Sequence, residues 1–364
     1  MTEKTVFTIL EEFQFDTRPV SCEPYGCGHI NQTHLVVCES GRRYILQKIN
    51  QHVFPNVPAL MKNIALVTEH LRTKETDERS VLTLIPTKSG EAYLEENEEY
   101  WRVYKFVEDS LCLQQAETEE DFYQSASAFG KFEDELKDFP IDQLYEIIPN
   151  FHNTPDRYRI FHEVLEKDVM DRAKDVEKEI QFVLEREKEM ATLQRMRNTG
   201  ELPVRVTHND TKLNNVLLDA QTRKALCVID LDTVMPGLSL YDYGDSIRFG
   251  AATAAEDEKD LSKVEMSLEK FQTYTRGFMQ AYPGLTEKEK EMLPMGAKTM
   301  TLECGLRFLT DYLDGDHYFA THYEGQNLDR CRTQFKLVAD MEDKWARMHE
   351  IVKEEQDKLV ANHR

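Results

Sequence analysis

The order of strand-like and helix-like segments constrains the fold of this chain more than any other feature of its sequence. Short β-branched or aromatic runs separated by turn residues fill the first third: VSCEPYG, THLVVCE, RRYILQKIN, VLTLIP and YWRVYKFVE. One helix is predicted among them, at about residues 58–72, where Leu60, Ile64, Val67 and Leu71 recur at helical spacing. The N-terminal third is therefore expected to form a β-sheet with one helix.

Helical periodicity dominates from about residue 117 onward, in segments rich in Glu, Lys and Arg that fit the solvated faces of core-packing helices. The predicted helices lie near residues 118–138, 157–196, 264–282, 286–313 and 329–358. A chain of 364 residues with 40% hydrophobic content can bury a large core. We predict an α+β fold with a small β-rich N-terminal lobe, residues 1–109, and a larger helical C-terminal lobe, residues 110–364.

The charge of the chain bears on its partners. Lys and Arg number 45 against 67 Asp and Glu, which gives a formal net charge of −22. Such a chain is not expected to attract nucleic acid or an anionic membrane, so we expect small-molecule partners. No stretch approaches the roughly 18–20 apolar residues that span a bilayer, and MTEKTVFTILEEFQF does not resemble a signal peptide. A cytoplasmic location is expected.

The seven cysteines are an odd, scattered set with no C-x-x-C pair. This pattern favours reduced thiols over a disulfide framework or a zinc site. We expect the cysteines to pack as small buried hydrophobic residues.

The stretch VTHNDTKLNNVLLD, residues 206–219, places polar side chains between two β-branched, apolar runs. A third apolar run, ALCVIDLDT, follows and ends in acidic residues, so the polar residues are predicted to lie on a loop between strands. From there Asp210 and Asn215 can reach the same point as Asp230. Two carboxylates and an amide beside Lys212 offer oxygen ligands for Mg²⁺, a cation for a γ-phosphoryl group and a base for a hydroxyl proton. The stretch predicts phosphoryl transfer, with a hydrogen-bonded turn as the alternative.

The same loop, HNDTKLNN, resembles the catalytic-loop pattern H-R-D-x-x-x-x-N of protein kinases. The run VIDLDTVMPGLSLYDYGDSIR resembles the motif that replaces D-F-G in the aminoglycoside and choline phosphotransferase superfamily. The resemblance implies a two-lobed, protein-kinase-like fold and direct in-line transfer from ATP. It assigns Asp210 and Lys212 as catalytic residues, Asn215 and Asp230 as metal ligands, and Mg²⁺ as the cofactor.

Further segments, from about Glu23 to Met341, resemble the N-acetylhexosamine 1-kinase family. They include EPYGCGHIN, RYILQKIN, WRVYKF, DSIRFGA, EDEKDLSKV and ECGLRFLTDYLDGDHYFAT. This resemblance implies ATP-dependent phosphorylation of the anomeric hydroxyl of N-acetylglucosamine or N-acetylgalactosamine, a bacterial sugar-salvage reaction. Two alternatives stay open: a kinase of another small alcohol, such as choline, homoserine, methylthioribose or an aminoglycoside, and a catalytically inactive nucleotide-binding module.

The glycine loop expected to cover the nucleotide departs from the general kinase pattern. YGCGHINQTHLVV supplies Gly26 and Gly28, but Asn31 stands where G-x-G-x-x-G has its third glycine. We predict that Gly26 and Gly28 bind the nucleotide.

The strand after this loop departs as well. If YILQ aligns with the V-A-I-K strand of kinases, Gln47 takes the place of the phosphate-binding lysine. Lys48 lies one place later, on the opposite strand face, so both residues are candidates for the phosphate contact. Glu69 is the only acidic residue in the core of the 58–72 helix that could pair with such a lysine. The adenine is expected near the connector YKFVEDS, around Phe106 and Glu108.

The acceptor pocket is predicted from distant segments that resemble the same sugar kinases. A neutral sugar calls for hydrogen-bonding side chains and a flat apolar wall. The candidate residues are His29, Asp210, Phe249, Arg307 and Tyr318. The alternatives are a surface role for His29, an ion pair of Arg307 with Glu303 one helical turn away, and core positions for Phe249 and Tyr318.

Three more polar residues near the loop have structural interpretations. His208 is expected to be a buried hydrogen-bonding residue that orients the loop. Asp242 and Asp245 could bind metal, but SLYDYGDSIRFG begins a helix. Asp242 is therefore expected to cap that helix or to brace the catalytic loop through backbone N–H groups.

Overall fold

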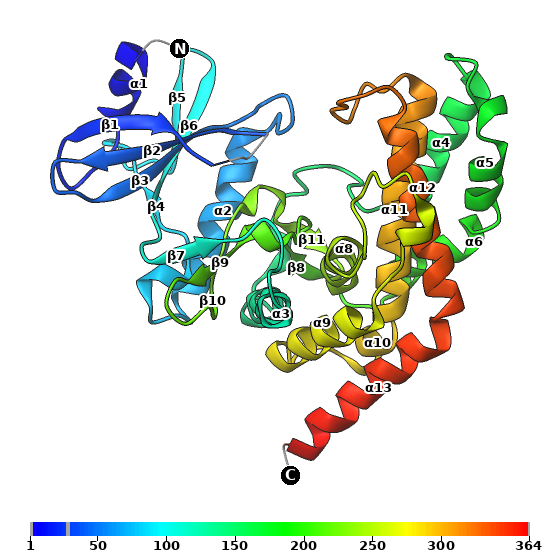
Figure 1. Cartoon of the computed structure of the whole chain (residues 1–364). Helices are drawn as coiled ribbons and strands as arrows, with labels where there is room; N and C mark the ends of the chain where they lie inside the picture. The colour runs from blue at the N-terminus through cyan, green and yellow to red at the C-terminus, as the bar shows by residue number, and fades with distance from the viewer. Residues whose placement is uncertain (1–2, 27–29, 363–364) are drawn as a thin grey trace.

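The computed structural model describes residues 3–26 and 30–362 of the chain. It has a β-sheet in its N-terminal region and mostly helices in its C-terminal region (Figure 1). The mixed α+β, kinase-like fold predicted from the sequence is confirmed. No helix within the described residues is both long and apolar enough to cross a membrane.

The N-terminal region is built on a six-stranded antiparallel sheet with the order β1-β2-β3-β6-β4, in which β5 also pairs with β6. The strands are β1 (Pro19–Pro24), β2 (Gln32–Cys38), β3 (Arg43–Lys48), β4 (Leu84–Ile85), β5 (Leu94–Glu96) and β6 (Glu99–Lys105). Strand β3 pairs with β6 so that Gln47 lies opposite Arg102 and Lys48 lies opposite Trp101. Because side chains alternate along a strand, Gln47 and Arg102 share one face of the sheet and Lys48 and Trp101 share the other.

The two faces of this sheet have different neighbours. Helix α1 (Glu3–Leu10) packs on the face of Trp101, where Leu10, Leu46 and Trp101 belong to one buried cluster. Helix α2 (Val57–Arg72) packs on the other face and shares a second cluster with Tyr104 and with Leu231 of the C-terminal region. The face that carries Gln47 and Arg102 is thus the one turned toward the rest of the molecule.

Two small sheets follow and carry the polar loop. One has the order β10-β9-β7, and the other pairs β8 with β11. Their strands are β7 (Ser110–Cys112), β8 (Arg205–Thr207), β9 (Val216–Asp219), β10 (Ala225–Val228) and β11 (Met235–Gly237). The loop between β8 and β9 therefore crosses from one small sheet to the other.

Helices form most of the C-terminal region (Figure 1). They are α3 (Glu119–Glu135), α4 (Thr154–Lys167), α5 (Glu177–Leu184), α6 (Glu187–Met190), α7 (Thr192–Thr199), α8 (Ser239–Gly250), α9 (Leu268–Ala281), α10 (Glu287–Glu291), α11 (Leu293–Asp314), α12 (Gln326–Asp343) and α13 (Trp345–Asn362). Helix α8 starts directly after β11 and packs against α3, α9 and α11. The polar loop therefore lies against α8, and α8 is itself packed among other helices.

The structure corrects several predicted elements. Helix α1 and strand β5 were not predicted, and the single helix expected at 157–196 is four shorter helices. The first break falls at Asp168, which has a left-handed backbone and whose carboxylate accepts the N–H groups of Arg172 and Ala173 at 2.9 and 3.2 Å. A side chain that accepts hydrogen bonds from nearby backbone N–H groups competes with the hydrogen bonds of a helix. The periodicity of charged residues does not reveal where such a break occurs.

The cysteines are free thiols at the six positions that the structure describes, as predicted. Cys38, Cys227 and Cys331 are buried, but Cys112 is exposed, so the expectation that all would be buried is wrong. Cys27 lies outside the described residues.

A close crossing of α8 and α11 gives a prediction for stability. A Cβ atom added to Gly244 would lie 2.3 Å from the carbonyl oxygen of Gly296, which is backbone and cannot rotate away. We expect Gly244→Ala to lower the free energy of unfolding by about 1–3 kcal/mol or more, the usual cost of overpacking. Urea unfolding monitored by circular dichroism measures the change in the free energy of unfolding. An unchanged midpoint would contradict the close approach of α8 and α11 at Gly244.

Candidate active site

The polar loop is held by the carboxylate of Asp242 in α8. Its Oδ2 and Oδ1 accept the backbone N–H groups of His208 and Asn209, both at 2.7 Å, and its backbone carbonyl accepts the hydroxyl of Thr211 at 2.7 Å. Asn209 has a positive φ of 64°, a conformation that is uncommon for residues other than glycine but that Asn adopts more readily than most. The prediction that Asp242 braces this loop is confirmed.

His208 is fully buried and ties the loop to the strand that precedes Asp230. Its Nε2 lies 2.9 Å from the carbonyl oxygen of Ile229, and its Nδ1 lies 3.3 Å from the backbone nitrogen of Asp210. Since a carbonyl only accepts and a backbone N–H only donates, the ring hydrogen is on Nε2. The predicted structural role of His208 is confirmed.

Asp210, Lys212 and Asn215 lie together at the end of this loop. Nζ of Lys212 is 2.7 Å from Oδ1 of Asp210. Nδ2 of Asn215 donates to the backbone carbonyl and to Oδ2 of Asp210, at 2.8 and 3.2 Å. Burial alone would lower the pKa of the Lys212 ammonium, but the carboxylate of Asp210 outweighs it and raises that pKa. A charged lysine therefore stands beside the carboxylate predicted to act as the base.

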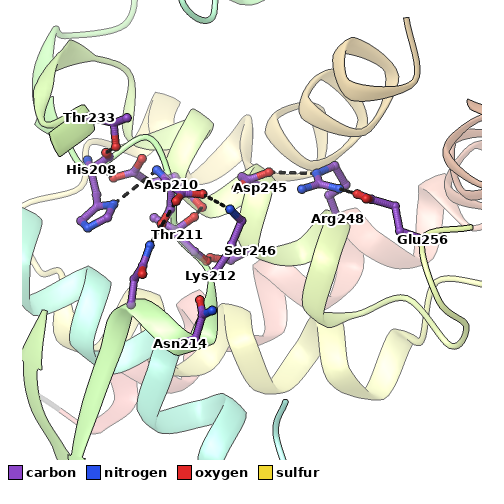
Figure 2. A network of polar contacts seen from close by, with 12 residues as sticks. His208, Asp210, Thr211, Lys212, Asn214, Thr233, Asp245, Ser246, Arg248 and Glu256 are labelled. Carbon is purple, nitrogen blue, oxygen red and sulfur yellow. Dashed lines mark hydrogen bonds and ion pairs between the residues drawn. The ribbon is translucent and has the colours of Figure 1, made fainter. Parts of the chain in front are cut away.

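The network continues from this pair toward α8 (Figure 2). Ser246 donates its hydroxyl to the carbonyl of Thr211 at 2.8 Å. Arg248 lies between two carboxylates, with Nε 2.8 Å from Asp245 and Nη1 2.7 Å from Glu256. Asp245 is thus paired with Arg248, as a structural residue would be.

Asp230 follows β10 and lies next to the loop. The backbone N–H of Ile229 donates to the carbonyl of Asn215 at 2.9 Å, which places Asp230 one residue from that contact. Burial, followed by the nearby carboxylates of Asp232 and Asp210, raises the pKa of Asp230 to about 6. A group of neighbouring carboxylates is a suitable environment for a cation.

The donor atoms here fit Mg²⁺ when it arrives with a nucleotide. Within residues 3–26 and 30–362, no three His, Cys, Asp or Glu side chains form a metal site by themselves. The carboxylate of Asp230 and the amide oxygen of Asn215 are hard oxygen ligands, and Mg²⁺ commonly uses one or two such ligands together with substrate phosphates. The residues present therefore fit a metal that is shared with the phosphates of ATP.

The structure describes some, but not all, of the residues predicted to contact the nucleotide. Gly26 has a φ of +77°, and open space surrounds the position that a Cβ atom would take. Gln47 accepts a hydrogen bond from Nε of Arg102 at 2.9 Å, whereas Lys48 pairs with Glu99 on the opposite face of the sheet. Gly28 and His29 lie outside the described residues.

Aromatic and charged side chains contact one another at the connector after β6. The guanidinium of Arg43 lies 4.1 Å from the ring centroid of Phe106 and forms an ion pair with Glu108. Tyr25 meets Phe106 edge to face, with ring centroids 5.9 Å apart. Phe106 is therefore close to the start of the glycine loop, as an adenine-binding residue would be.

The predicted acceptor residues lie on α8, on α11 and on the segment after α11. Nη2 of Arg307 donates to the hydroxyl of Tyr318 at 3.2 Å, and Tyr318 is 70% exposed. Phe249 is 42% exposed, so neither aromatic residue is in the core. Glu303 does not pair with Arg307, because Nδ1 of His152 lies 2.8 Å from its Oε1. The alternatives of a helix ion pair and of core positions are wrong.

Sequence reasoning missed two groups of polar residues near these sites. Asp311 accepts the backbone N–H groups of His317, Tyr318 and Phe319 at 2.9, 2.8 and 2.9 Å, and so fixes the segment that carries Tyr318. Arg102 is buried and pairs with Asp232. An arginine inside an otherwise apolar strand was a signal for this pair, because a buried charge needs a partner.

This fold, with a braced Asp–Lys–Asn loop beside Asp230, defines a kinase-like phosphotransferase. The sequence matches the Phosphotransferase enzyme family (APH) over residues 21–270, and the chain belongs to that family.

Solved structures with the same fold cover nearly the whole chain. An aminoglycoside phosphotransferase from Alicyclobacillus acidocaldarius has a TM-score of 0.64 at 14% identity, covering 95% of this chain and 96% of its own. A microcompartment-associated aminopropanol kinase has a TM-score of 0.58 at 14% identity, with coverages of 96% and 99%. An amicoumacin kinase solved with AMP-PNP and Ca²⁺ has a TM-score of 0.58 at 14% identity, with coverages of 94% and 94%. The chain is thus a small-molecule phosphotransferase whose acceptor these distant relatives do not identify.

Proposed function

We propose that this protein transfers the γ-phosphoryl group of ATP to the anomeric hydroxyl of N-acetylglucosamine or N-acetylgalactosamine. ATP lies between the N-terminal lobe, residues 1–109, and the C-terminal lobe, residues 110–364, with its adenine near Phe106 and Glu108. The observation that carries the kinase assignment is the contact of Asp210 with both Lys212 and Asn215 on a braced loop.

In this proposal Asp210 orients the sugar hydroxyl and accepts its proton as the oxygen attacks the γ-phosphorus. Lys212 places a positive charge near the transferred group, and the bond to the leaving ADP oxygen breaks in line with the attack. Asn215 and Asp230 hold Mg²⁺, which neutralises charge on the phosphates. The AMP-PNP and Ca²⁺ bound to the amicoumacin kinase support a nucleotide with a divalent ion.

The charges around the predicted acceptor residues favour a neutral sugar. The guanidinium of Arg307 lies 5.7, 5.5 and 5.4 Å from the ring centroids of Phe151, Tyr318 and Phe319. Burial and the charge of Arg307 together lower the pKa of Arg157, so two guanidinium groups are near each other here. Hydroxyl and acetamide oxygens can accept from arginine and tyrosine, and a sugar face can stack on aromatic rings.

The main alternative is a kinase of a cationic alcohol, since similar structures include an aminopropanol kinase and an aminoglycoside phosphotransferase. Such acceptors would keep Asp210, Lys212 and the metal ligands. Their ammonium groups would, however, approach the arginine pair, and Glu303 is already engaged by His152 and by the hydroxyl of Thr154 at 2.6 Å. An inactive nucleotide-binding module is disfavoured because the catalytic set is intact.

Acceptor choice provides the test of this proposal. We expect N-acetylglucosamine and N-acetylgalactosamine to be phosphorylated far better than choline, aminopropanol or kanamycin, with ADP release and ³¹P NMR as the measurements. The product should be an acid-labile 1-phosphate. The methyl glycoside of each sugar is the matched control, because it differs only at the anomeric oxygen and should not react.

Two outcomes would contradict the proposal. A methyl glycoside phosphorylated as fast as the free sugar would show that another hydroxyl reacts. Turnover confined to a cationic alcohol would support the alternative, and we would then expect Arg307→Ala to leave that turnover unchanged.

A further inference from the structure

A buried arginine connects the N-terminal sheet to the segment that carries Asp230. Arg102 on β6 is 1% exposed and Asp232 is 2% exposed. Nη1 of Arg102 donates to Oδ1 of Asp232 at 2.5 Å, and Nη2 donates to Oδ2 at 2.9 Å. This two-point contact fixes both the distance and the angle between the two side chains.

Neighbouring side chains hold each member of the pair in place. Oε1 of Gln47 accepts Nε of Arg102 at 2.9 Å, from the adjacent strand β3. Nδ2 of Asn31 donates to Oδ2 of Asp232 at 2.6 Å, while its Oδ1 accepts the backbone N–H of Asn50 at 2.9 Å. The pair is therefore oriented by the sheet and by the start of β2, and not only by mutual attraction.

The sequence candidates for a kinase-like lysine–glutamate pair do not form one on this face of the sheet, and Arg43, the charged residue of β3 on the same face as Gln47, pairs with Glu108. Gln47 is neutral at the position that aligns with the kinase lysine. Lys48 is on the opposite face with Glu99, and Glu69 is exposed on α2. Arg102, opposite Gln47 in the register of β3 and β6, brings the positive charge to the face that the lysine would occupy.

We propose that Arg102 and Asp232 form a positioning ion pair that replaces the lysine–glutamate pair of other kinases and holds Asp230 at the metal site. Arg102 acts through Asp232, and it does not itself contact the metal. The inference rests on the proposed metal role of Asp230 but not on the identity of the acceptor.

The backbone of Asp230 explains why positioning is needed. Its φ of 60° and ψ of 58° are in the left-handed region, which costs a residue with a Cβ atom some free energy, although Asp enters it more readily than most. On the N-terminal side, the N–H and the carbonyl of Ile229 contact Asn215 and His208, both at 2.9 Å. On the C-terminal side, Leu231 packs in the cluster that includes α2, and Asp232 is the next side chain with a hydrogen-bond partner on the N-terminal sheet. The strained residue is thus anchored from both sides.

The experiment must separate positioning from simple stabilisation. A single Arg102→Met change leaves the buried carboxylate of Asp232 without its arginine and is expected to destabilise the fold through that charge alone. The double variant Arg102→Met/Asp232→Leu is therefore the informative one. Replacing both members of a buried ion pair by apolar side chains is often neutral for stability. Arg186→Met/Glu342→Leu is the comparison variant, because Arg186 and Glu342 also form a two-point pair, at 2.9 and 2.7 Å, although this pair is less buried and Glu342 also contacts Lys298.

Calorimetric titration with ADP, with and without Mg²⁺, gives a readout that does not depend on turnover. We expect the double variant to bind metal-free ADP like the parent but to lose about 10–100-fold of the Mg²⁺-dependent part of ADP affinity, the usual cost of removing a partner of a metal ligand. The half-saturating Mg²⁺ concentration for turnover should rise in parallel. The control pair should show neither change.

Asp230→Asn in the same titration distinguishes the possible failures. If Asp230→Asn weakens the Mg²⁺ effect and the double variant does not, the positioning pair is wrong and the metal site stands. If neither variant alters the Mg²⁺ effect, the proposed metal site itself is wrong. If the double variant weakens metal-free ADP binding equally, Arg102 contacts the nucleotide directly and the positioning role is overturned.

Discussion

Replacement of Asp210 by Asn is expected to lower kcat by about 10²–10⁴-fold, the range that general-base groups contribute. Asparagine keeps the shape of the side chain and can still contact Lys212 and Asn215, but it cannot accept the hydroxyl proton. The fold and the affinity for ATP should therefore change little. Steady-state kinetics with saturating ATP and sugar, together with ADP binding, measure the two effects separately.

Asp219→Asn is the control for this variant. Asp219 ends β9, on the strand that leaves the same loop, and its carboxylate bonds the turn at Thr222 and the guanidinium of Arg79. We expect its kcat to stay near that of the parent. An Asp210→Asn enzyme within tenfold of the parent would rule out Asp210 as the base.

Replacement of Asp230 by Ala is expected to abolish turnover, because it removes the carboxylate that we assign to Mg²⁺. Asn215→Ala should have a milder effect, since an amide oxygen is the weaker of the two ligands. We expect it to raise the half-saturating Mg²⁺ concentration about tenfold or more, within the range for lost partners of a metal site. Titration of turnover and of ADP binding with Mg²⁺ measures both variants.

The adjacent asparagine offers a matched control. Nδ2 of Asn214 donates to Oε1 of Gln114 at 3.3 Å and is not part of the Asp210 contact. Asn214→Ala should leave the Mg²⁺ titration unchanged. Equal Mg²⁺ dependence in Asn214→Ala, Asn215→Ala and the parent would contradict the assignment of Asn215.

Sequence patterns over a few residues correctly predicted contacts between residues that are close in the chain. Asp210, Lys212 and Asn215 lie within one loop between two strands, so their spacing alone predicted that they meet. Alternation along β3 also predicted correctly that Lys48 is on the other face from Gln47. The single helix predicted at 157–196 is wrong, because Asp168 ends α4 with a local hydrogen bond that periodicity does not reveal.

Contacts across the molecule could not be predicted in this way. The sequence did not indicate that Arg307 meets Tyr318 rather than Glu303, because both partners are within reach of a helical arginine and only the path of the segment after α11 selects one. Asp311 sets that path by accepting three consecutive backbone N–H groups. A carboxylate at the end of a helix has many possible partners, and its sequence position alone does not identify them.

The sequence by itself determined the α+β fold class and which polar residues meet on the loop between β8 and β9, because strand alternation, helical spacing and a short loop act over a few residues. Only the tertiary structure decided which cation pairs with Asp232, two residues after Asp230. Arg102 and Asp232 are 130 positions apart, and they meet because β6 pairs with β3 in one register and α2 packs that face of the sheet against Leu231. A shift of one residue would turn Arg102 to the other face, so the pair depends on the packing of the whole sheet.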